Sequence, residues 1–289
     1  MKKNYILLFP LFALLILEFS SCDLFQPSTP VPGYIHIDKI DLVTNYSLEG
    51  SNSSKISDAW VYVDDQLIGC FELPTTFPVI AQGSHQVKIR PGIKVNGIAS
   101  NRSAYPFYTM YTQQVDFEPG KRITLTPTVN YYSGTHFDLT EDFEMVNGNL
   151  DSTTHSNSNL HFVSSPSTSV CEGGKSGLIT ATAAKPFVEI ATVTHHVLPK
   201  AGAPVFLELN YRCNYEFTVS IYAWGTASVG QFTVLHFNPS INWNKTYVYL
   251  TPTVSSAYNA TDYQIAIGML NTTGADSTYC LLDNVKLIH

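Results

Sequence analysis

The segment VFLELNYRCNYEFTVSIYAW, residues 205–224, decides the fold class of the chain. Its apolar residues fall on alternate positions, and polar residues such as Glu208, Asn210 and Arg212 stand between them. A period of two places the apolar side chains on one face of a strand and is typical of a half-buried sheet. The segment exceeds the usual strand length of about five or six residues, so we expect a turn near Asn214 to split it into two strands.

Shorter apolar segments follow at regular spacing up to the C-terminus. They read FTVLHF, TYVYLT, DYQIAIGM and LLDNVKLI. Several short strands separated by turn residues are typical of sandwiches built from two sheets. We therefore expect residues 135–289 to form a β-sandwich domain.

Residues 34–132 show the same pattern of short alternating segments separated by turn residues. The run AWVYV alternates and ends at Asp64 and Asp65, which predict a turn, and EPGK at 118–121 predicts a hairpin between QQVDF and RITLT. No stretch shows helical apolar spacing for more than a couple of turns. The sequence thus predicts an all-β chain of two β-sandwich domains, divided near residue 133.

Composition narrows the classes of function. Charged residues make up 13% of the 289 residues, about half of the roughly 25% usual in soluble proteins. Hydrophobic residues make up 44%, which is enough to build a sizeable core. The formal net charge is −7, and the 16 Lys and Arg residues are spread along the chain without a basic patch. Nucleic acid is therefore excluded as an expected partner.

Residues 1–21 predict a signal peptide. Lys2 and Lys3 precede an apolar run of 12 residues, ILLFPLFALLIL. A membrane-spanning helix needs about 20 residues, so this run is too short to span a bilayer but suits a secretory leader.

The leader ends in Phe19-Ser20-Ser21-Cys22, which resembles the lipobox of envelope lipoproteins from Bacteroidetes-like bacteria. Phe19 stands where Leu is commoner, and Glu18 adds an unusual charge. The resemblance implies that Cys22 becomes the acylated N-terminus, carries palmitate and anchors the chain to a membrane, because each buried CH₂ contributes about 0.8 kcal/mol. The alternative is an ordinary signal peptide with a chance cysteine. We expect the protein to be located in the cell envelope, in particular at the outer membrane. Whether it faces the periplasm or the exterior stays open.

Residues 22–33 form the expected linker between this anchor and the first domain. Pro27, Pro30 and Pro32 favour an extended, semi-rigid spacer.

The first domain carries the pattern VYVDDQLIG…LPTTFPVIAQGSHQVKIRPG. It resembles the PEGA-type surface module, a small Ig-like β-sandwich, and the resemblance implies a spacer or interaction module without catalytic residues. Tyr105, Phe107, Tyr108 and Tyr111 follow close together. We favour an aromatic layer that caps the sandwich core over an exposed contact patch.

The second domain carries four short motifs: EDFE at 141–144, EGGKSGL at 172–178, NW at 242–243 and LDNVKL at 282–287. Together they resemble the galactose-binding-like jelly roll, the fold of many carbohydrate-binding modules. The resemblance implies a jelly roll over residues 135–289.

The environment expected for Asp283 provides a physical test of this resemblance. Asp283 shares a strand parity with Leu281 and Val285, which predicts a carboxylate at the edge of the core, and a buried unpaired charge costs several kcal/mol. In the fold that the chain resembles, the matching Asp often joins a Glu of the opening strand, here Glu144, at a structural calcium ion. Oxygen ligands suit calcium. The alternative is that Asp283 accepts hydrogen bonds from backbone amides.

Strand parity also selects candidate ligand-binding residues. Tyr222 and Trp224 lie two residues apart on the polar face of their strand, and Tyr247 and Tyr249 do the same on another. Exposed aromatic rings at such spacing form a platform on which the apolar face of a sugar stacks. The alternative is that loops cover these rings.

Catalytic motifs are missing from the sequence. It contains neither H-E-x-x-H nor G-x-S-x-G, and Gly173-Gly174-Lys175-Ser176 lacks the first glycine of a P-loop because Ser169 occupies that position. A carboxylate pair of a glycosidase is not excluded by counting, but glycosidase domains generally need more chain than either half provides.

If Cys22 is acylated, four cysteines remain, and three full pairings of Cys70, Cys171, Cys213 and Cys280 are possible. A Cys171–Cys280 bridge is one option. Cys213 lies on the apolar parity, so it can instead be a buried free thiol.

These observations predict a lipid-anchored, non-catalytic cell-envelope protein that binds glycan or another envelope component through its jelly roll. The alternative is a structural or adhesive envelope subunit that contacts other proteins through its tyrosine-rich surface. A hydrolase is a third and less favoured hypothesis.

Overall fold

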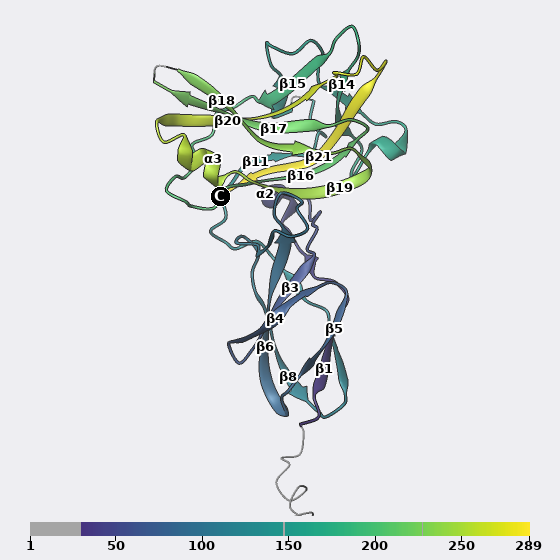
Figure 1. Cartoon of the computed structure of the whole chain (residues 1–289), viewed down its shortest axis with the longest axis vertical. Helices are drawn as coiled ribbons and strands as arrows, with labels where there is room; N and C mark the ends of the chain where they lie inside the picture. The colour runs from purple at the N-terminus through teal and green to yellow at the C-terminus, as the bar shows by residue number, and fades with distance from the viewer. Residues whose placement is uncertain (1–29, 147, 227) are drawn as a thin grey trace, which may run out of the picture.

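The computed structural model describes residues 30–146, 148–226 and 228–289 (Figure 1). The predicted signal peptide, Cys22 and most of the expected linker lie outside these ranges. Strands dominate the described residues, beside α2 (Tyr46–Glu49), α3 (Thr251–Ser256) and one 3-10 turn at Ser167–Ser169. None of the helices in these ranges is long and apolar enough to cross a bilayer. The prediction of an all-β chain is confirmed.

The first unit, at the lower end of Figure 1, is a sandwich of two main sheets. One sheet has the order β5-β1-β9, in which β1 and β9 run parallel. The other has the order β4-β3-β6-β7, with β8 also paired to β6, and a short pair joins β2 to β10. The strands are β1 (Gly33–Ile37), β2 (Asp41–Leu42), β3 (Asp58–Val63), β4 (Gln66–Glu72), β5 (Thr75–Val79), β6 (Gly83–Lys94), β7 (Arg102–Ala104), β8 (Tyr111–Phe117), β9 (Arg122–Leu125) and β10 (Thr128–Val129).

Two predicted turns in this unit have different outcomes. Asp64 and Asp65 both have positive φ, 47° and 67°, and connect β3 to β4 in a hairpin, as predicted. A turn also forms at 118–121, where the Lys121 N–H donates to the Glu118 carbonyl at 3.2 Å. The predicted hairpin is wrong, however, because β8 pairs with β6 whereas β9 crosses to the other sheet and pairs with β1. The same turn residues allow either path, and burial of each strand's apolar face selects the sheet.

The second unit, at the upper end of Figure 1, is a jelly roll of two antiparallel sheets. The six-stranded sheet has the order β13-β14-β21-β16-β19, with β11 also paired to β21, and the five-stranded sheet has the order β12-β15-β20-β17-β18. The strands are β11 (Phe137–Glu141), β12 (Leu150–Ser152), β13 (His161–Val163), β14 (Ser176–Ala181), β15 (Phe187–Thr192), β16 (Phe206–Cys213), β17 (Phe217–Gly225), β18 (Val229–Phe237), β19 (Ser240–Tyr249), β20 (Ala260–Leu270) and β21 (Thr278–Ile288).

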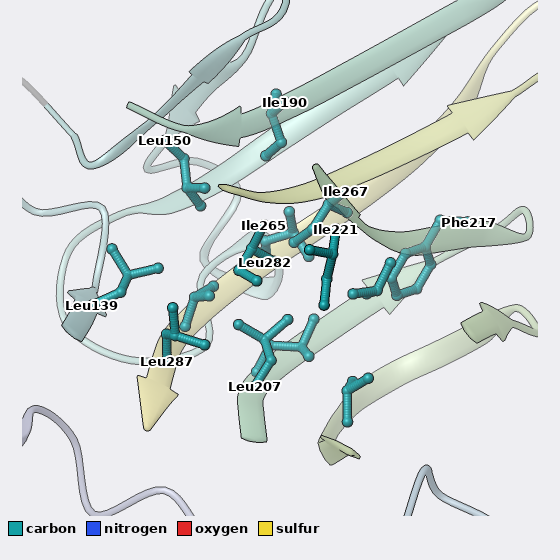
Figure 2. Packing of buried hydrophobic residues seen from close by; sticks show 14 of the residues in the cluster. Leu139, Leu150, Ile190, Leu207, Phe217, Ile221, Ile265, Ile267, Leu282 and Leu287 are labelled. Carbon is teal, nitrogen blue, oxygen red and sulfur yellow. The ribbon is translucent and has the colours of Figure 1, made fainter. Parts of the chain in front are cut away.

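The alternating segment at 205–224 becomes β16 and β17, and the chain turns between them at residues 214–216, as expected. The two strands belong to opposite sheets, so their apolar faces meet. Figure 2 shows Leu207 and Leu282 of one sheet packed toward Ile221, Ile265 and Ile267 of the other. Each of these side chains is at most 1% exposed, and full burial of such a side chain contributes about 1.5–3 kcal/mol.

The last strand departs from the predicted alternation. Cys280 and Leu282 face the core, and so do Val285 and Leu287. The pairing register between β16 and β21 shifts just after Asp283, and Asn284 has a φ of 47°, so the strand contains a bulge. The predicted parity of Leu281, Asp283, Val285 and Leu287 is therefore wrong, and Asp283 lies on the opposite face from the core.

The outer face of the six-stranded sheet is covered by the first unit. Phe206, Tyr247 and Ile288 of the second unit belong to the same apolar cluster as the first unit's core. The Asn96 N–H donates to the Tyr247 carbonyl at 2.9 Å, and the Tyr249 N–H donates to Asn96 Oδ1 at 2.8 Å. The first unit thus caps the C-terminal end of the open edge of β19.

A polar cluster occupies the centre of this interface. Glu208 is fully buried and accepts hydrogen bonds from the hydroxyls of Tyr105 and Tyr131, at 2.8 and 2.9 Å. Lys245 Nζ lies 3.2 Å from Glu208 Oε2. Lys286 donates from Nζ to the Ser51 carbonyl at 2.5 Å. The polar residues of this sheet face therefore have partners beneath the first unit: Glu208 faces Lys245, and Glu208 and Lys286 also bond to residues of the first unit. Buried charges without partners would be too costly.

The aromatic run of the first unit forms the layer that faces this cluster. Tyr105, Phe107 and Tyr108 are 1%, 7% and 2% exposed, and Tyr105 packs edge-on against Phe206 with ring centroids 5.2 Å apart. The run is a capping layer, as favoured from the sequence, and it caps the junction of the two units as well as the core of the first.

Candidate functional site

A cleft of about 370 Å³ opens on the outer face of the five-stranded sheet. Tyr222 and Trp224 of β17 line it together with Gln264 of β20, Ala191 of β15 and residues 151–155, which are the end of β12 and the loop after it. Because Ile221 and Ala223 point into the core, the alternate residues Tyr222 and Trp224 point outward. The structure therefore brings this predicted aromatic pair into one open hollow, where both rings are partly exposed.

Tyr222 is held by a carboxylate that the sequence analysis did not select. Its hydroxyl donates to Glu189 Oε1 at 2.6 Å, and Thr153 Oγ1 donates to the same oxygen at 3.0 Å. Gln231 Nε2 donates to Glu189 Oε2 at 2.6 Å. Burial and the bond to Glu189 raise the pKa of Tyr222. Glu189 is 4% exposed and engaged on both oxygens, so it orients the tyrosine and is not placed as a free base.

Trp224 is fixed by a second set of contacts. Its indole N–H donates to Gln264 Oε1 at 2.9 Å, and Gln264 in turn donates to the Thr192 carbonyl at 2.7 Å. The ring of His195 lies against the indole, with centroids 4.8 Å apart and an interplanar angle of 35°. Asp262 Oδ1 lies 2.5 Å from His195 Nδ1. A hydrogen bond from Thr261 and the contact with His195 lower the pKa of Asp262, which favours its charged form.

The cleft therefore combines two oriented aromatic rings with amide and hydroxyl groups at its wall. Rings that are already held in place lose little conformational freedom when a ligand packs on them. Donors and acceptors arranged around them suit a ligand that has both an apolar face and many hydroxyl groups.

The second predicted aromatic pair lies elsewhere. Tyr247 is 1% exposed, and its hydroxyl accepts a hydrogen bond from the Lys55 N–H at 2.9 Å and contacts the Tyr108 hydroxyl at 3.2 Å. Tyr249 packs on Phe206 at a centroid distance of 5.0 Å. The prediction that this pair forms an exposed platform is wrong, because the first unit covers the face of β19 that points away from the core.

The two predicted calcium ligands have hydrogen-bond donors as neighbours. Glu144 Oε1 accepts from the N–H groups of Gly174 and Lys175, at 2.6 and 2.9 Å. Asp283 Oδ2 accepts from Ser176 Oγ at 2.6 Å, and Oδ1 accepts from the Asn284 N–H at 2.8 Å.

Burial raises the pKa of Asp283 to about 6. Within the described ranges no group of three or more His, Cys, Asp or Glu side chains is placed to hold a metal ion. N–H and O–H donors suit a carboxylate and not a cation, so this arrangement matches the amide-capped alternative, and calcium stays a prediction.

The four cysteines in the described ranges are free thiols. Cys213 and Cys280 are buried opposite each other on β16 and β21, whereas Cys70 is exposed. The acylation expected at Cys22 concerns a residue outside the described ranges.

Comparison of the chain with known proteins gave matches among solved structures but not among family models or curated proteins. Among solved structures it is similar to the C-terminal family 22 carbohydrate-binding module of Clostridium thermocellum Xyn10B, with 11% identity and a TM-score of 0.37 over 52% of this chain and 91% of that one.

Two further structures give similar values. The family 11 carbohydrate-binding module of Lic26A-Cel5E from Clostridium thermocellum has 15% identity and a TM-score of 0.37 over 54% of this chain and 95% of that one. The K2 cleaved adhesin domain of Lys-gingipain has 14% identity and a TM-score of 0.36 over 54% and 98%. The fold class of the second unit rests on its own two sheets and their register.

Proposed function

We propose that this chain is a non-catalytic envelope protein that binds glycan in the cleft of the five-stranded sheet. The observation that carries the proposal is the pair Tyr222 and Trp224, two oriented rings that line one hollow of about 370 Å³. Carbohydrates have apolar faces that pack on aromatic rings and hydroxyl groups that pair with polar side chains. Gln264 and residues 151–155 provide polar groups within the same hollow.

Membrane anchoring through Cys22 is part of the same proposal and is supported by the lipobox-like sequence that ends at this residue. Expression with labelled palmitate tests it directly. The wild-type protein is expected to incorporate label, and Cys22→Ala is expected to remove it. A wild-type protein without label would overturn the anchor and leave the cleft proposal standing.

The glycan proposal is tested by screening the whole mature chain on a glycan array and measuring affinity for the best ligand. Each of Tyr222→Ala and Trp224→Ala is expected to weaken binding about tenfold, since the stacking of one ring contributes roughly 1 kcal/mol or more. Tyr132→Ala is the matched control, because Tyr132 is 45% exposed and lies outside the cleft. Tyr222→Phe keeps the ring and removes its hydrogen bond to Glu189, so it measures the contribution of the ring to binding separately from that of the hydroxyl.

Binding that survives both alanine variants would overturn the cleft as the site. Absence of glycan binding by the folded protein would favour a structural or adhesive subunit. The run at Tyr105, Phe107 and Tyr108 gives that alternative no support, because these residues are buried at the junction of the two units.

A further inference from the structure

A second hollow, of about 430 Å³, lies between the two units and is separate from the cleft. The first unit contributes Lys55 and Lys94 to its lining, and the second unit contributes Lys245 of β19. Asn96 of the first unit and Asn238 and Asn244 of the second also line it. No Asp or Glu of the described ranges lines this interdomain pocket, so its wall is cationic in a chain whose net charge is negative.

The three lysines differ in how their charges are balanced. Lys94 Nζ donates to Glu72 at 2.9 Å, and that carboxylate lies outside the pocket lining. Lys245 has a side chain only 3% exposed, and its Nζ faces Glu208 at 3.2 Å without making a hydrogen bond. Lys55 Nζ donates to Asn244 Oδ1 at 2.5 Å, and no carboxylate of the described residues lies within 4 Å of it.

Of the three lysines at the pocket, Lys55 is therefore the one without a carboxylate partner among the described residues. Partial burial and, to a smaller degree, the charge of Lys94 lower the pKa of Lys55, because both disfavour its charged form. Lys245 is ion-paired with Glu208 but makes no hydrogen bond, and a buried N–H donor without an acceptor costs free energy. An oxyanion in the pocket would offset both costs, because charge-assisted hydrogen bonds to lysine are among the stronger polar contacts.

We propose that the interdomain pocket binds a small ligand that bears an oxyanion. The same chemistry is offered by the carboxylate of an acidic sugar and by a free inorganic oxyanion such as sulfate. The volume is within the range of about 300–1,000 Å³ usual for small-molecule sites. Because both units line the pocket, the ligand is expected to stabilise their junction.

The test measures the thermal stability of the whole mature chain with sodium glucuronate, sodium sulfate, glucose or sodium chloride at matched ionic strength. Glucuronate or sulfate is expected to raise Tm above the chloride control, and glucose is not. A rise with glucuronate alone identifies an acidic sugar. An equal rise with sulfate identifies the oxyanion itself only where Lys55→Met removes it, because sulfate also stabilises folded proteins through its exclusion from their surface. No rise with either anion would overturn the proposal.

Variants assign the effect to the pocket. Lys55→Met is expected to weaken binding about tenfold, the loss of one hydrogen bond to a charged group, and Lys55→Arg is expected to retain it. Lys39→Met is the control, because Lys39 is 70% exposed and far from the pocket lining. Trp224→Ala is expected to leave this binding unchanged, which separates the pocket from the glycan cleft. Wild-type affinity in a folded Lys55→Met protein would overturn the assignment.

Discussion

Replacing Lys286 by methionine tests the energetics of the buried junction. Lys286 is 1% exposed, and burial lowers its pKa from 10.5 to about 8, although the nearby Glu208 raises it. The unfolded chain therefore binds more protons than the folded chain between about pH 8 and pH 10.5. Stability must then rise with pH through this window, and the cost of burying the charge is fully present below pH 8.

The magnitude follows from the two pKa values. Linkage with pKa values of about 8 and 10.5 gives a rise in the free energy of unfolding of roughly 2 kcal/mol between pH 7 and pH 9.5. The upper limit avoids the range in which tyrosines such as Tyr105, whose pKa burial raises, contribute the opposite slope. Methionine has a comparable unbranched side chain but no proton to titrate.

Urea denaturation at pH 7 and pH 9.5 measures this contribution. The wild-type protein is expected to gain roughly 2 kcal/mol relative to Lys286→Met over this interval. The absolute stability of the variant also reflects the lost bond to Ser51, so the pH slope is the decisive quantity. Lys121→Met is the control at an exposed lysine and is expected to keep the wild-type slope. Equal slopes in the wild type and in Lys286→Met would refute the reasoning.

Three further measurements test other parts of the structure. Leu207→Ala in the core is expected to cost about 2–5 kcal/mol in chemical denaturation, against less than about 0.5 kcal/mol for the exposed Leu48→Ala, and similar losses for both would contradict the assigned core. A calcium ion held by Glu144 and Asp283 predicts a lower Tm after a chelator is added, and an unchanged Tm would count against it. Thiol labelling of the native chain is expected at the exposed Cys70, whereas labelling of the buried cysteines before unfolding would show that the sheets open.

The alternation at 205–224 was sufficient to predict the strands, the sandwich and the outward direction of Tyr222 and Trp224. It depends only on local geometry, because successive side chains of a strand point to opposite faces. Glu189 could have been selected by the same reasoning, since FVEIAT on β15 has it between the core residues Val188 and Ile190.

Other features depend on contacts that no local pattern contains. The alternation of β19 predicts that Tyr247 faces solvent. The residues of the first unit that cover this face lie more than a hundred positions earlier in the sequence. The bulge after Asp283 reverses the parity of the last strand without a change in its apolar character. The pair formed by His195 and Asp262 joins a loop to β20, and nothing in the local sequence around either residue indicates the other as its partner.

The capping of the β19 edge by Asn96 has a practical consequence for dissecting the chain. If the C-terminal half were produced alone, it would present bare backbone groups at the end of β19 and the apolar side chains of Phe206, Tyr247 and Ile288 to water. Strands of that kind recruit one another, so an isolated half is expected to self-associate, and an apparent multivalent avidity for polysaccharide would then arise from clustering. Analytical ultracentrifugation of the half beside the intact chain would expose the artefact before any affinity is interpreted.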